Sequence, residues 1–370
     1  MKLIPHRRFG ALALTGALAL TLTACGSGSS ADSGASDGSG SLSGSLAAAG
    51  ASSQEKAVAG WIAGFNDTHP DVAVSYDAVG SGGGREQFLA GAVQLAGSDA
   101  ALKEDELEAA TERCEGGEAV ELPLYISPIA VVYNLPDVDA EHLQLSAATL
   151  ARIFNRDITT WDDPAIVAEN PGVTLPSTGI IPVNRSDESG TTENFTEYLE
   201  AASDGAWPHE ASGDWPLSGG QSGQGTQGVI DTVSGAEGAI GYADASRAGD
   251  LGTVALKVGD EYVPFSAEAA AKVVDASPRA ADATDKRLVV ELDRTTTEAG
   301  AYPLVLISYS IACSTYADAA DADNVKAYLT YVASPEGQER AADPSVAGAA
   351  PISDALRTEV QAAIDSISAG

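Results

Sequence analysis

The stretch that decides the fold reads Gly179-Ile180-Ile181-Pro182-Val183 and, after Asn184, Arg185-Ser186-Asp187-Glu188-Ser189-Gly190-Thr191-Thr192-Glu193-Asn194-Phe195. The apolar run predicts a strand, and the spacing of Phe195, Tyr198 and Leu199 predicts a helix behind it. A helix N-terminus carries unpaired N–H groups and partial positive charge, and small residues let an anion reach them. An arginine beside it adds a planar fork of donors that fits phosphate or carboxylate. This junction therefore predicts a site for a tetrahedral oxyanion.

Two further junctions place small residues before a predicted helix. The segment Ala49-Gly50-Ala51-Ser52-Ser53-Gln54-Glu55 precedes Val58 and Trp61, and Ser52 and Glu55 have the spacing of a capping box. The segment Gly80-Ser81-Gly82-Gly83-Gly84 lies between a strand predicted at 72–76 and a helix predicted at 85–93. One such junction is typical of an ordinary capped helix. Three in one chain favour a binding site.

The rest of the chain alternates predicted strands and helices, which indicates the α/β class. Two long apolar runs, Pro123 to Tyr133 and Pro303 to Ala312, are far apart in the sequence. They suit two strands that cross between two lobes. A chain of 370 residues is long enough for two domains. In a two-lobed protein of this kind we expect the ligand in the cleft between the lobes.

The N-terminus is typical of an export signal. Basic residues precede an apolar run from Phe9 to Thr23, which is too short to span a membrane comfortably. The run ends in Leu22-Thr23-Ala24-Cys25, which resembles a bacterial lipobox. We therefore expect a lipoprotein signal peptide at 1–24 and lipidation, typically with palmitate, of Cys25. The alternative is an ordinary signal peptide with a chance cysteine. Residues 25–45 are rich in Gly and Ser and predict a flexible tether.

Charge and cysteine content narrow the class of protein. The formal net charge of −33 argues against a nucleic-acid partner and repels anions at long range. An anionic ligand must then be held by local donors. Cys114 and Cys313 remain after the lipidation site, and in an exported protein we expect them to form a disulfide. The alternative is two buried free thiols.

Asp99, in the segment Leu95-Ala96-Gly97-Ser98-Asp99-Ala100, does not fit an oxyanion site at first sight. A carboxylate repels an anion and helps only where the ligand carries a proton to donate. Phosphate near neutral pH carries one, and fully ionised sulfate does not. Spacing alone favours a surface or capping role for Asp99.

The chain resembles the phosphate-binding lipoprotein of the bacterial phosphate-specific ABC transporter. The matching segments follow the family's order over residues 46–365: Ala49 to Ser53, Gly80 to Gly83, Gly97 to Ala100, Ile153 to Asn155, Thr160 to Pro164, Arg185 to Thr192, and Gly238 to Tyr242. The resemblance implies a type II periplasmic-binding fold, with one lobe at 46–125 plus 306–370 and the other at 126–305. It implies capture of inorganic phosphate and delivery to membrane permease subunits at the outer face of the cytoplasmic membrane.

The resemblance also implies the ligand set. The family's phosphate ligands fall on Ser52, Ser53, Ser81, Asp99, Arg185, Ser189, Gly190 and Thr191. Asp99 accepts the phosphate proton in this interpretation, and Asp187 orients the guanidinium of Arg185. The sequence has Ser53 where many members have an aromatic residue, and Gly82 to Gly84 are richer in glycine than usual. No cofactor and no metal are implied.

Three other interpretations stay open. A secreted phosphatase needs a metal cluster or an activated nucleophile, but the histidines at 6, 69, 142 and 209 are scattered and show no metal-ligand spacing. We therefore expect no enzyme activity. A binding protein for another oxyanion, such as sulfate or molybdate, is disfavoured by Asp99, because this carboxylate requires a protonated ligand. A scaffolding lipoprotein would have no tight anion site.

Overall fold

The computed structural model describes residues 42–370, so the predicted signal peptide, Cys25 and most of the predicted tether lie outside the described residues. The described residues form one compact unit. The first strand, β1 (Gly44–Gly50), begins inside the range 25–45 expected for the tether, so residues 44 and 45 belong to the sheet instead. Among the residues that the structure describes, no helix is both long and apolar enough to cross a membrane.

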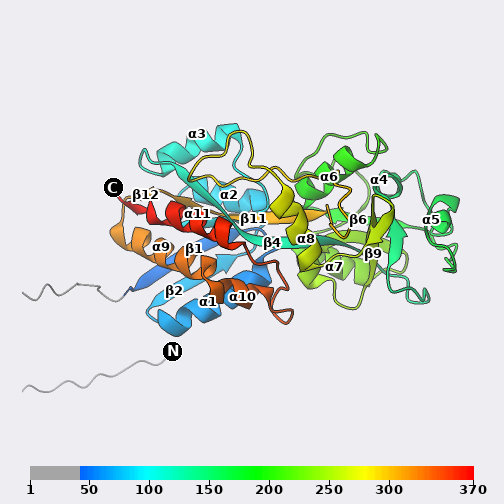
Figure 1. Ribbon diagram of the computed structural model, residues 1–370, viewed down its shortest axis with the longest axis horizontal. Coiled ribbons are helices and arrows are strands. Elements are labelled where there is room, and N and C mark those ends of the chain that lie inside the picture. The colour runs from blue at the N-terminus through cyan, green and yellow to red at the C-terminus, as the bar shows by residue number, and fades with distance from the viewer. Residues whose placement is uncertain (1–41) are drawn as a thin grey trace, which may run out of the picture. The chain divides into compact units, whose positions relative to one another are not determined.

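Strands and helices alternate along most of the chain, as predicted for the α/β class (Figure 1). The N-terminal elements are α1 (Glu55–Thr68), β2 (Val72–Asp77), α2 (Ser81–Leu89), β3 (Leu95–Ser98), α3 (Glu104–Arg113) and β4 (Ala119–Tyr133). The middle of the chain contains β5 (Leu143–Leu145), α4 (Ala147–Phe154), α5 (Pro164–Glu169), β6 (Ile181–Arg185), α6 (Gly190–Ala202), β7 (Gln221–Gly223), α7 (Gly225–Ser234), β8 (Ala239–Asp244), the 3-10 helix η1 (Ala245–Arg247), β9 (Gly252–Val258), β10 (Glu261–Val263) and α8 (Ala267–Ala276). The C-terminal part contains β11 (Val305–Cys313), β12 (Thr315–Tyr316), α9 (Ala319–Ala333), α10 (Pro335–Ala342), α11 (Asp354–Asp365) and β13 (Ser368–Ala369).

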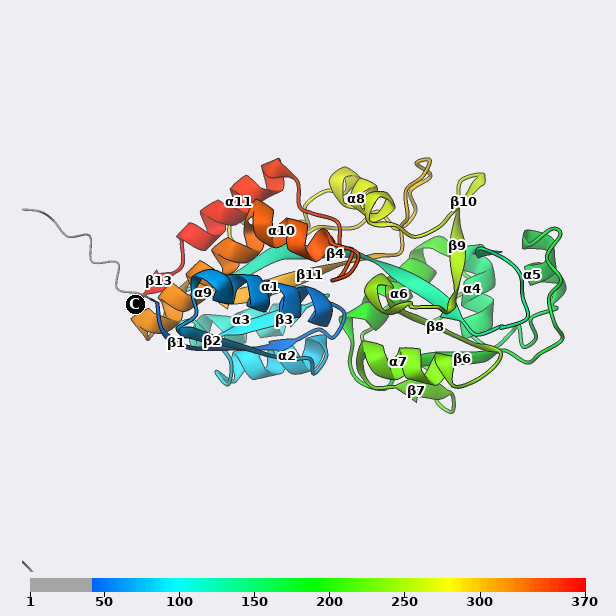
Figure 2. The same ribbon diagram turned by 90° about the horizontal axis from the view of Figure 1, so that it is seen from below.

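One large sheet organises the described residues, in the strand order β2-β1-β3-β11-β4-β8-β6-β7. The pairs at both ends of this order are parallel, and the strands in the middle are antiparallel. We call β1, β2 and β3, with the helices α1, α2 and α3, the first half. We call β6, β7 and β8, with α6, α7 and η1, the second half. Helix α1 lies on one side of β1 and β2, and α2 lies on the other (Figure 2).

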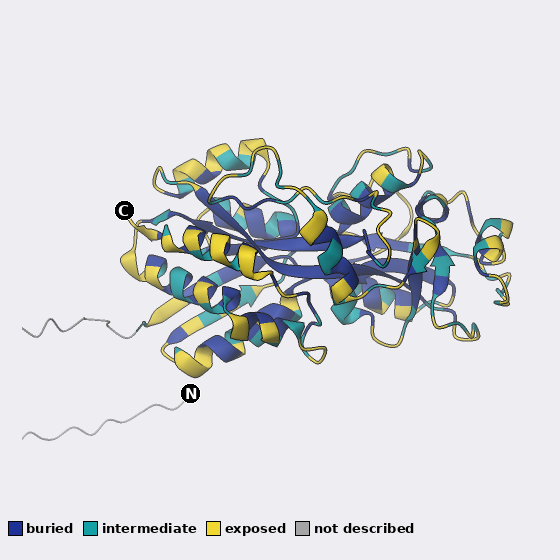
Figure 3. Ribbon diagram, in the orientation of Figure 1, coloured by how far each residue is buried: buried dark blue, intermediate teal, exposed yellow. Residues whose placement is uncertain are grey.

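The strands β4 and β11 connect the two halves. Residues 119–128 of β4 pair with β11, and its last residues, from Ile129 to Tyr133, pair with β8. Both strands are buried over their full length, which explains their near-continuous apolar sequence (Figure 3). These are the two long runs expected to cross between lobes. The exact lobe boundaries, at 125/126 and 305/306, stay a prediction.

Helix α2 differs from its prediction. The sequence predicts a glycine-rich turn followed by a helix from Arg85 to Val93, but α2 begins at Ser81 and ends at Leu89. Gly82, Gly83 and Gly84 therefore form the first turn of the helix. Gly84 lies against β1, because a Cβ at residue 84 would be 2.4 Å from the Cα of Gly50. Close packing outweighs the low helix propensity of glycine here.

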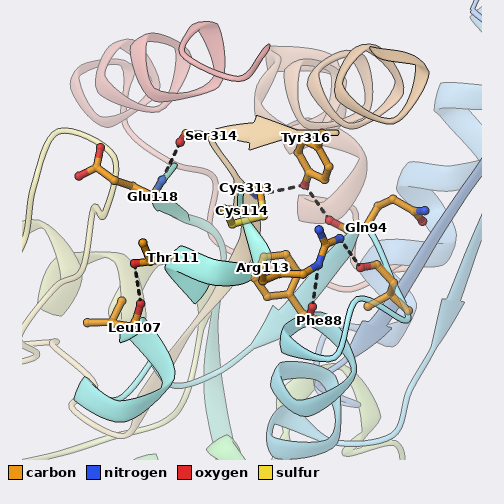
Figure 4. The surroundings of a disulfide bond; sticks show 11 residues. Phe88, Gln94, Leu107, Thr111, Arg113, Cys114, Glu118, Cys313, Ser314 and Tyr316 are labelled. Carbon is orange, nitrogen blue, oxygen red and sulfur yellow. Dashed lines mark hydrogen bonds between the residues drawn. A yellow bond between two sulfur atoms is a disulfide. The ribbon is translucent and has the colours of Figure 1, made fainter. Parts of the chain in front are cut away.

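The predicted disulfide between Cys114 and Cys313 is present, with the two Cα atoms 5.1 Å apart (Figure 4). It joins the end of α3 to the end of β11. Arg113 next to it donates from Nε to the carbonyl of Phe88 at 3.0 Å, and its guanidinium lies over the rings of Phe88 and Tyr316. The bond closes a loop of 199 residues in sequence. A loop of this length is worth about 4–5 kcal/mol in the chain-entropy model.

We expect thiol labelling of the oxidised, denatured mature protein to modify neither Cys114 nor Cys313. After reduction, both should be labelled, and the midpoint of urea unfolding should fall because the unfolded chain gains freedom. Mass spectrometry after labelling measures the first outcome, and tryptophan fluorescence measures the second. Two labelled thiols without reductant would refute the bridge.

Candidate functional site

The predicted ligand residues lie at the ends of strands and the starts of helices, where the two halves meet. Ser52 and Ser53 lie in the turn between β1 and α1, and Ser81 is the first residue of α2. Asp99 directly follows β3. Arg185 ends β6, Ser189 is the N-cap of α6, and Gly190 and Thr191 begin that helix. All eight residues are buried.

Asp99 lies at the centre of these residues. Its Oδ1 accepts a hydrogen bond from Ser53 Oγ at 2.7 Å, and its Oδ2 accepts one from Thr191 Oγ1 at 2.9 Å. Its backbone N–H donates to Ser81 Oγ at 3.1 Å. The surface or capping role that spacing favoured for Asp99 is therefore wrong, because the carboxylate is 4% exposed and lies beneath the start of α6.

Burial raises the pKa of Asp99, because a charged carboxylate loses its hydration there. The hydrogen bonds from Ser53 and Thr191 and the charge of Arg185 oppose this shift. These hydrogen-bond donors and Arg185 therefore stabilise the charged form of the Asp99 carboxylate. Its hydrogen-bond partners come from both halves, since Ser53 precedes α1 and Thr191 belongs to α6.

Gly190 allows this approach of α6. A Cβ at residue 190 would lie 2.7 Å from both Asp99 Cβ and Ser81 Oγ. Any side chain would therefore push the start of α6 away from Asp99 and Ser81. Asn194, one turn further along α6, donates from Nδ2 to the carbonyls of Asp99 and Gly190, both at 2.8 Å.

Asp187 holds the guanidinium of Arg185 in one orientation. Arg185 Nε donates to Asp187 Oδ1 at 2.9 Å, and Nη2 donates to Oδ2 at 2.5 Å. The N–H of Gly225 also donates to Oδ1, at 3.0 Å. Burial alone raises the pKa of Asp187, but the hydrogen bonds and charge of Arg185 and the Gly225 N–H outweigh it and lower the pKa. The orienting role predicted for Asp187 agrees with this geometry.

The structure adds a fourth helix start that the sequence analysis missed. Thr226, at the start of α7, donates its N–H to Ser52 Oγ at 2.9 Å, and the two side-chain oxygens are 3.0 Å apart. Ser52 therefore does not cap α1 in a box with Glu55, as predicted; Gln54 is the N-cap and makes no side-chain cap bond. The segment Gly223-Gln224-Gly225-Thr226 before the apolar positions of α7 was the signal available in the sequence.

The helices at the site are capped differently from most of those elsewhere. Three of them, α1, α2 and α7, have no side-chain cap hydrogen bond, and only α6 has one, from Ser189. Of the seven other α-helices in the described residues, α3 also lacks a side-chain cap hydrogen bond. The remaining six are capped by their own serine or aspartate, at Ser146, Asp163, Ser266, Asp318, Ser334 and Ser353. Uncapped N-termini keep N–H donors and partial positive charge for an external acceptor. This applies to α1 and α2, whereas the N–H groups of Gly225 and Thr226 at the start of α7 already donate to Asp187 and Ser52. The site thus has the chemistry of an anion site.

The described residues also limit what else the site can hold. Within 42–370 no three His, Cys, Asp or Glu side chains come together in a way that could hold a metal ion. His209 bonds to Asn155 and His142 to Thr253, both outside the cluster around Asp99.

Comparison with known proteins gives a consistent relationship. Residues 35–336 match the family model of a PBP superfamily domain. The chain is 34% identical over 326 residues to phosphate-binding protein PstS 3 of Mycobacterium leprae, covering 87% of this chain and 86% of the relative. It is 34% identical over 373 residues to phosphate-binding protein PstS 2 of Mycobacterium tuberculosis, covering 98% of this chain and 99% of the relative.

Solved structures share the fold at low sequence identity. A high affinity periplasmic phosphate-binding protein solved with phosphate superposes with a TM-score of 0.67 at 20% identity, covering 86% of this chain and 93% of that one. A phosphate-binding protein from Stenotrophomonas maltophilia gives 0.64 at 18% identity, with the same coverage. The α/β periplasmic-binding fold predicted from the sequence is thereby confirmed, and the chain belongs to the PBP superfamily and, within it, to the PstS family of phosphate-binding proteins.

Proposed function

We propose that this protein captures inorganic phosphate between its two halves and delivers it to the permease of an ABC transporter for import. The observation that carries the proposal is the buried carboxylate of Asp99 among donors from both halves. A carboxylate in an oxyanion site is useful only where the anion brings a proton. Membership of the PstS family supports the same ligand.

Each predicted ligand has a defined task in this proposal. The hydroxyls of Ser52, Ser81 and Ser189, and the N–H groups at the starts of α1, α2 and α6, donate to phosphate oxygens. The hydroxyls of Ser53 and Thr191, which donate to Asp99 in the structure, turn to the ion when it binds. Asp99 accepts the proton that phosphate retains near neutral pH. Arginine has five N–H donors, and the two bonds to Asp187 leave three for phosphate. The N–H groups of Gly225 and Thr226, at the start of α7, hold Asp187 and Ser52 in place by hydrogen bonds.

Capture and release require the halves to separate and close. We place the two lobes at 46–125 plus 306–370 and at 126–305, joined through β4 and β11. Closure brings Ser53, Ser81 and Asp99 against Arg185, Ser189 and Thr191 and excludes water from the ion. In a chain of net charge −33, these short-range donors must supply the attraction. We further propose that lipid on Cys25 anchors the protein at the outer face of the cytoplasmic membrane, where it meets the permease subunits.

We expect phosphate to bind tightly at neutral pH and sulfate hardly at all, because ionised sulfate has no proton for Asp99. Isothermal titration calorimetry with both ions measures the difference. Comparable affinities would contradict the assignment and favour a general oxyanion-binding protein.

Lowering the pH provides an internal check. Burial raises the pKa of Asp99, so acidification protonates its carboxylate. The protonated carboxyl group can then donate a hydrogen bond to a sulfate oxygen. Sulfate affinity should therefore rise as the pH falls through this pKa in the unsubstituted protein, and Asp99→Asn should bind sulfate without that pH dependence.

Arg185→Lys should weaken phosphate binding by well over tenfold. Lysine replaces a fork that Asp187 has already oriented with a single mobile ammonium group, so several charge-assisted hydrogen bonds to the ion are lost. Calorimetry at neutral pH gives the dissociation constants. Arg279→Lys is a matched control, because Arg279 pairs with the exposed Glu359, away from the site, and should leave the affinity unchanged. An unaltered constant for Arg185→Lys would rule out the role of Arg185.

A further inference from the structure

A second arginine, Arg85, lies behind the proposed phosphate ligands. It belongs to α2, one turn after Ser81, and is 2% exposed. Its Nε donates to both carboxylate oxygens of Glu106, at 3.0 and 3.1 Å. Its Nη1 donates to Ser98 Oγ at 3.0 Å, and its Nη2 donates to Glu188 Oε1 at 3.0 Å. One buried guanidinium thus contacts three separate segments of the chain.

Arg85 and its contacts involve three of the four segments that carry proposed phosphate ligands; the turn with Ser52 and Ser53 is the exception. Arg85 itself belongs to the helix that begins with Ser81. Ser98 precedes Asp99, and its hydroxyl donates to the carbonyl of Ala100 at 2.6 Å, which fixes the turn that presents Asp99. Glu188 lies in the loop between Arg185 and Ser189. Arg85 therefore couples the positions of α2, of Asp99 and of the loop after β6.

The carboxylate of Glu188 reaches out of the second half towards the first. A Cβ at residue 82, in the first turn of α2, would lie 1.9 Å from Glu188 Oε2. On the other side, a Cβ at residue 213 would lie 2.6 Å from Glu188 Oε1. Glycine at both positions gives the carboxylate room to approach Arg85. Glu188 has 26% of its side chain exposed, so it is only partly shielded from water.

The two carboxylate partners of Arg85 differ in one respect. Glu106 belongs to α3, in the same half as Arg85, so that pair persists whether the halves are together or apart. Glu188 belongs to the second half, so that pair breaks when the halves separate. Burial lowers the pKa of Arg85, but the charges of Glu188 and Glu106 outweigh it and raise the pKa. Arginine keeps its charge in any case, because its ordinary pKa is far above neutral pH.

We propose that Arg85 and Glu188 are positioning residues that latch the halves together around phosphate and slow its release. The inference rests on the proposed phosphate-binding function and deepens it. Neither side chain is placed in contact with the ion. Their ion pair stabilises the closed arrangement only, so it acts on the rate of dissociation, as buried charge pairs across an interface generally do.

The matched substitutions Glu188→Gln and Glu106→Gln test the latch. Each removes one negative charge next to Arg85 and keeps a side chain of the same size that can still accept a hydrogen bond. Radiolabelled phosphate is bound to the mature protein and chased with excess unlabelled phosphate, and the dissociation rate is measured. We expect Glu188→Gln to release phosphate about tenfold faster, and Glu106→Gln to stay within about twofold of the unsubstituted protein.

The sign of the effect separates the latch from simple repulsion. If Glu188 only repelled the anion, its neutralisation would strengthen binding and slow release. Slower or unchanged release from Glu188→Gln, or equal acceleration by both substitutions, would overturn the latch while leaving phosphate binding intact. Failure of the unsubstituted protein to bind phosphate would overturn the proposed function as well. The association rate should not fall in Glu188→Gln, because the latch forms after the ion has entered.

Discussion

The Asp99 carboxylate accepts hydrogen bonds from Ser53 on one side and Thr191 on the other, and much of the site's geometry follows from this. A buried carboxylate loses its hydration and is stable only where donors replace the lost water. Here those donors come from two parts of the chain that meet only in the folded protein. Gly190 is necessary to the arrangement, because any side chain there would separate α6 from Asp99 and Ser81.

The rest of the fold brings helix N-termini to this carboxylate without bringing net positive charge. Four helices begin around it, and three of them lack a side-chain cap of their own. Three buried arginines nearby, Arg85, Arg185 and Arg294, are each paired with carboxylates. Attraction for an anion is therefore short-range and directional. A protein of strongly negative net charge can bind an anion in this way and still repel anions that do not fit.

The sequence reveals the parts of the site that are continuous in the chain. The Arg185–Thr191 junction was visible because an apolar strand, small residues and a periodic helix follow one another. The two long strands were visible because burial on both faces removes polar alternation. The predicted start of α2 is wrong, because glycine has low helix propensity and the sequence therefore indicates a turn. Glycine occurs in the first turn of α2 because Gly84 packs closely against β1. Ser52 was misjudged because its partner, Thr226, is 174 residues away.

The antiparallel pairing of β3 with β11 also sets an order of assembly during synthesis. Nearly two hundred residues separate the cysteines at the ends of α3 and β11, and β6, β7 and β8 are all made in between. Long-range pairing is slow to form, and exposed strand edges invite association with other chains. An emerging chain therefore carries β3 with one open edge until β11, at Val305–Cys313, has been made. Until then Cys114 has no partner either, so the disulfide between Cys114 and Cys313 can form only after most of the chain has been made.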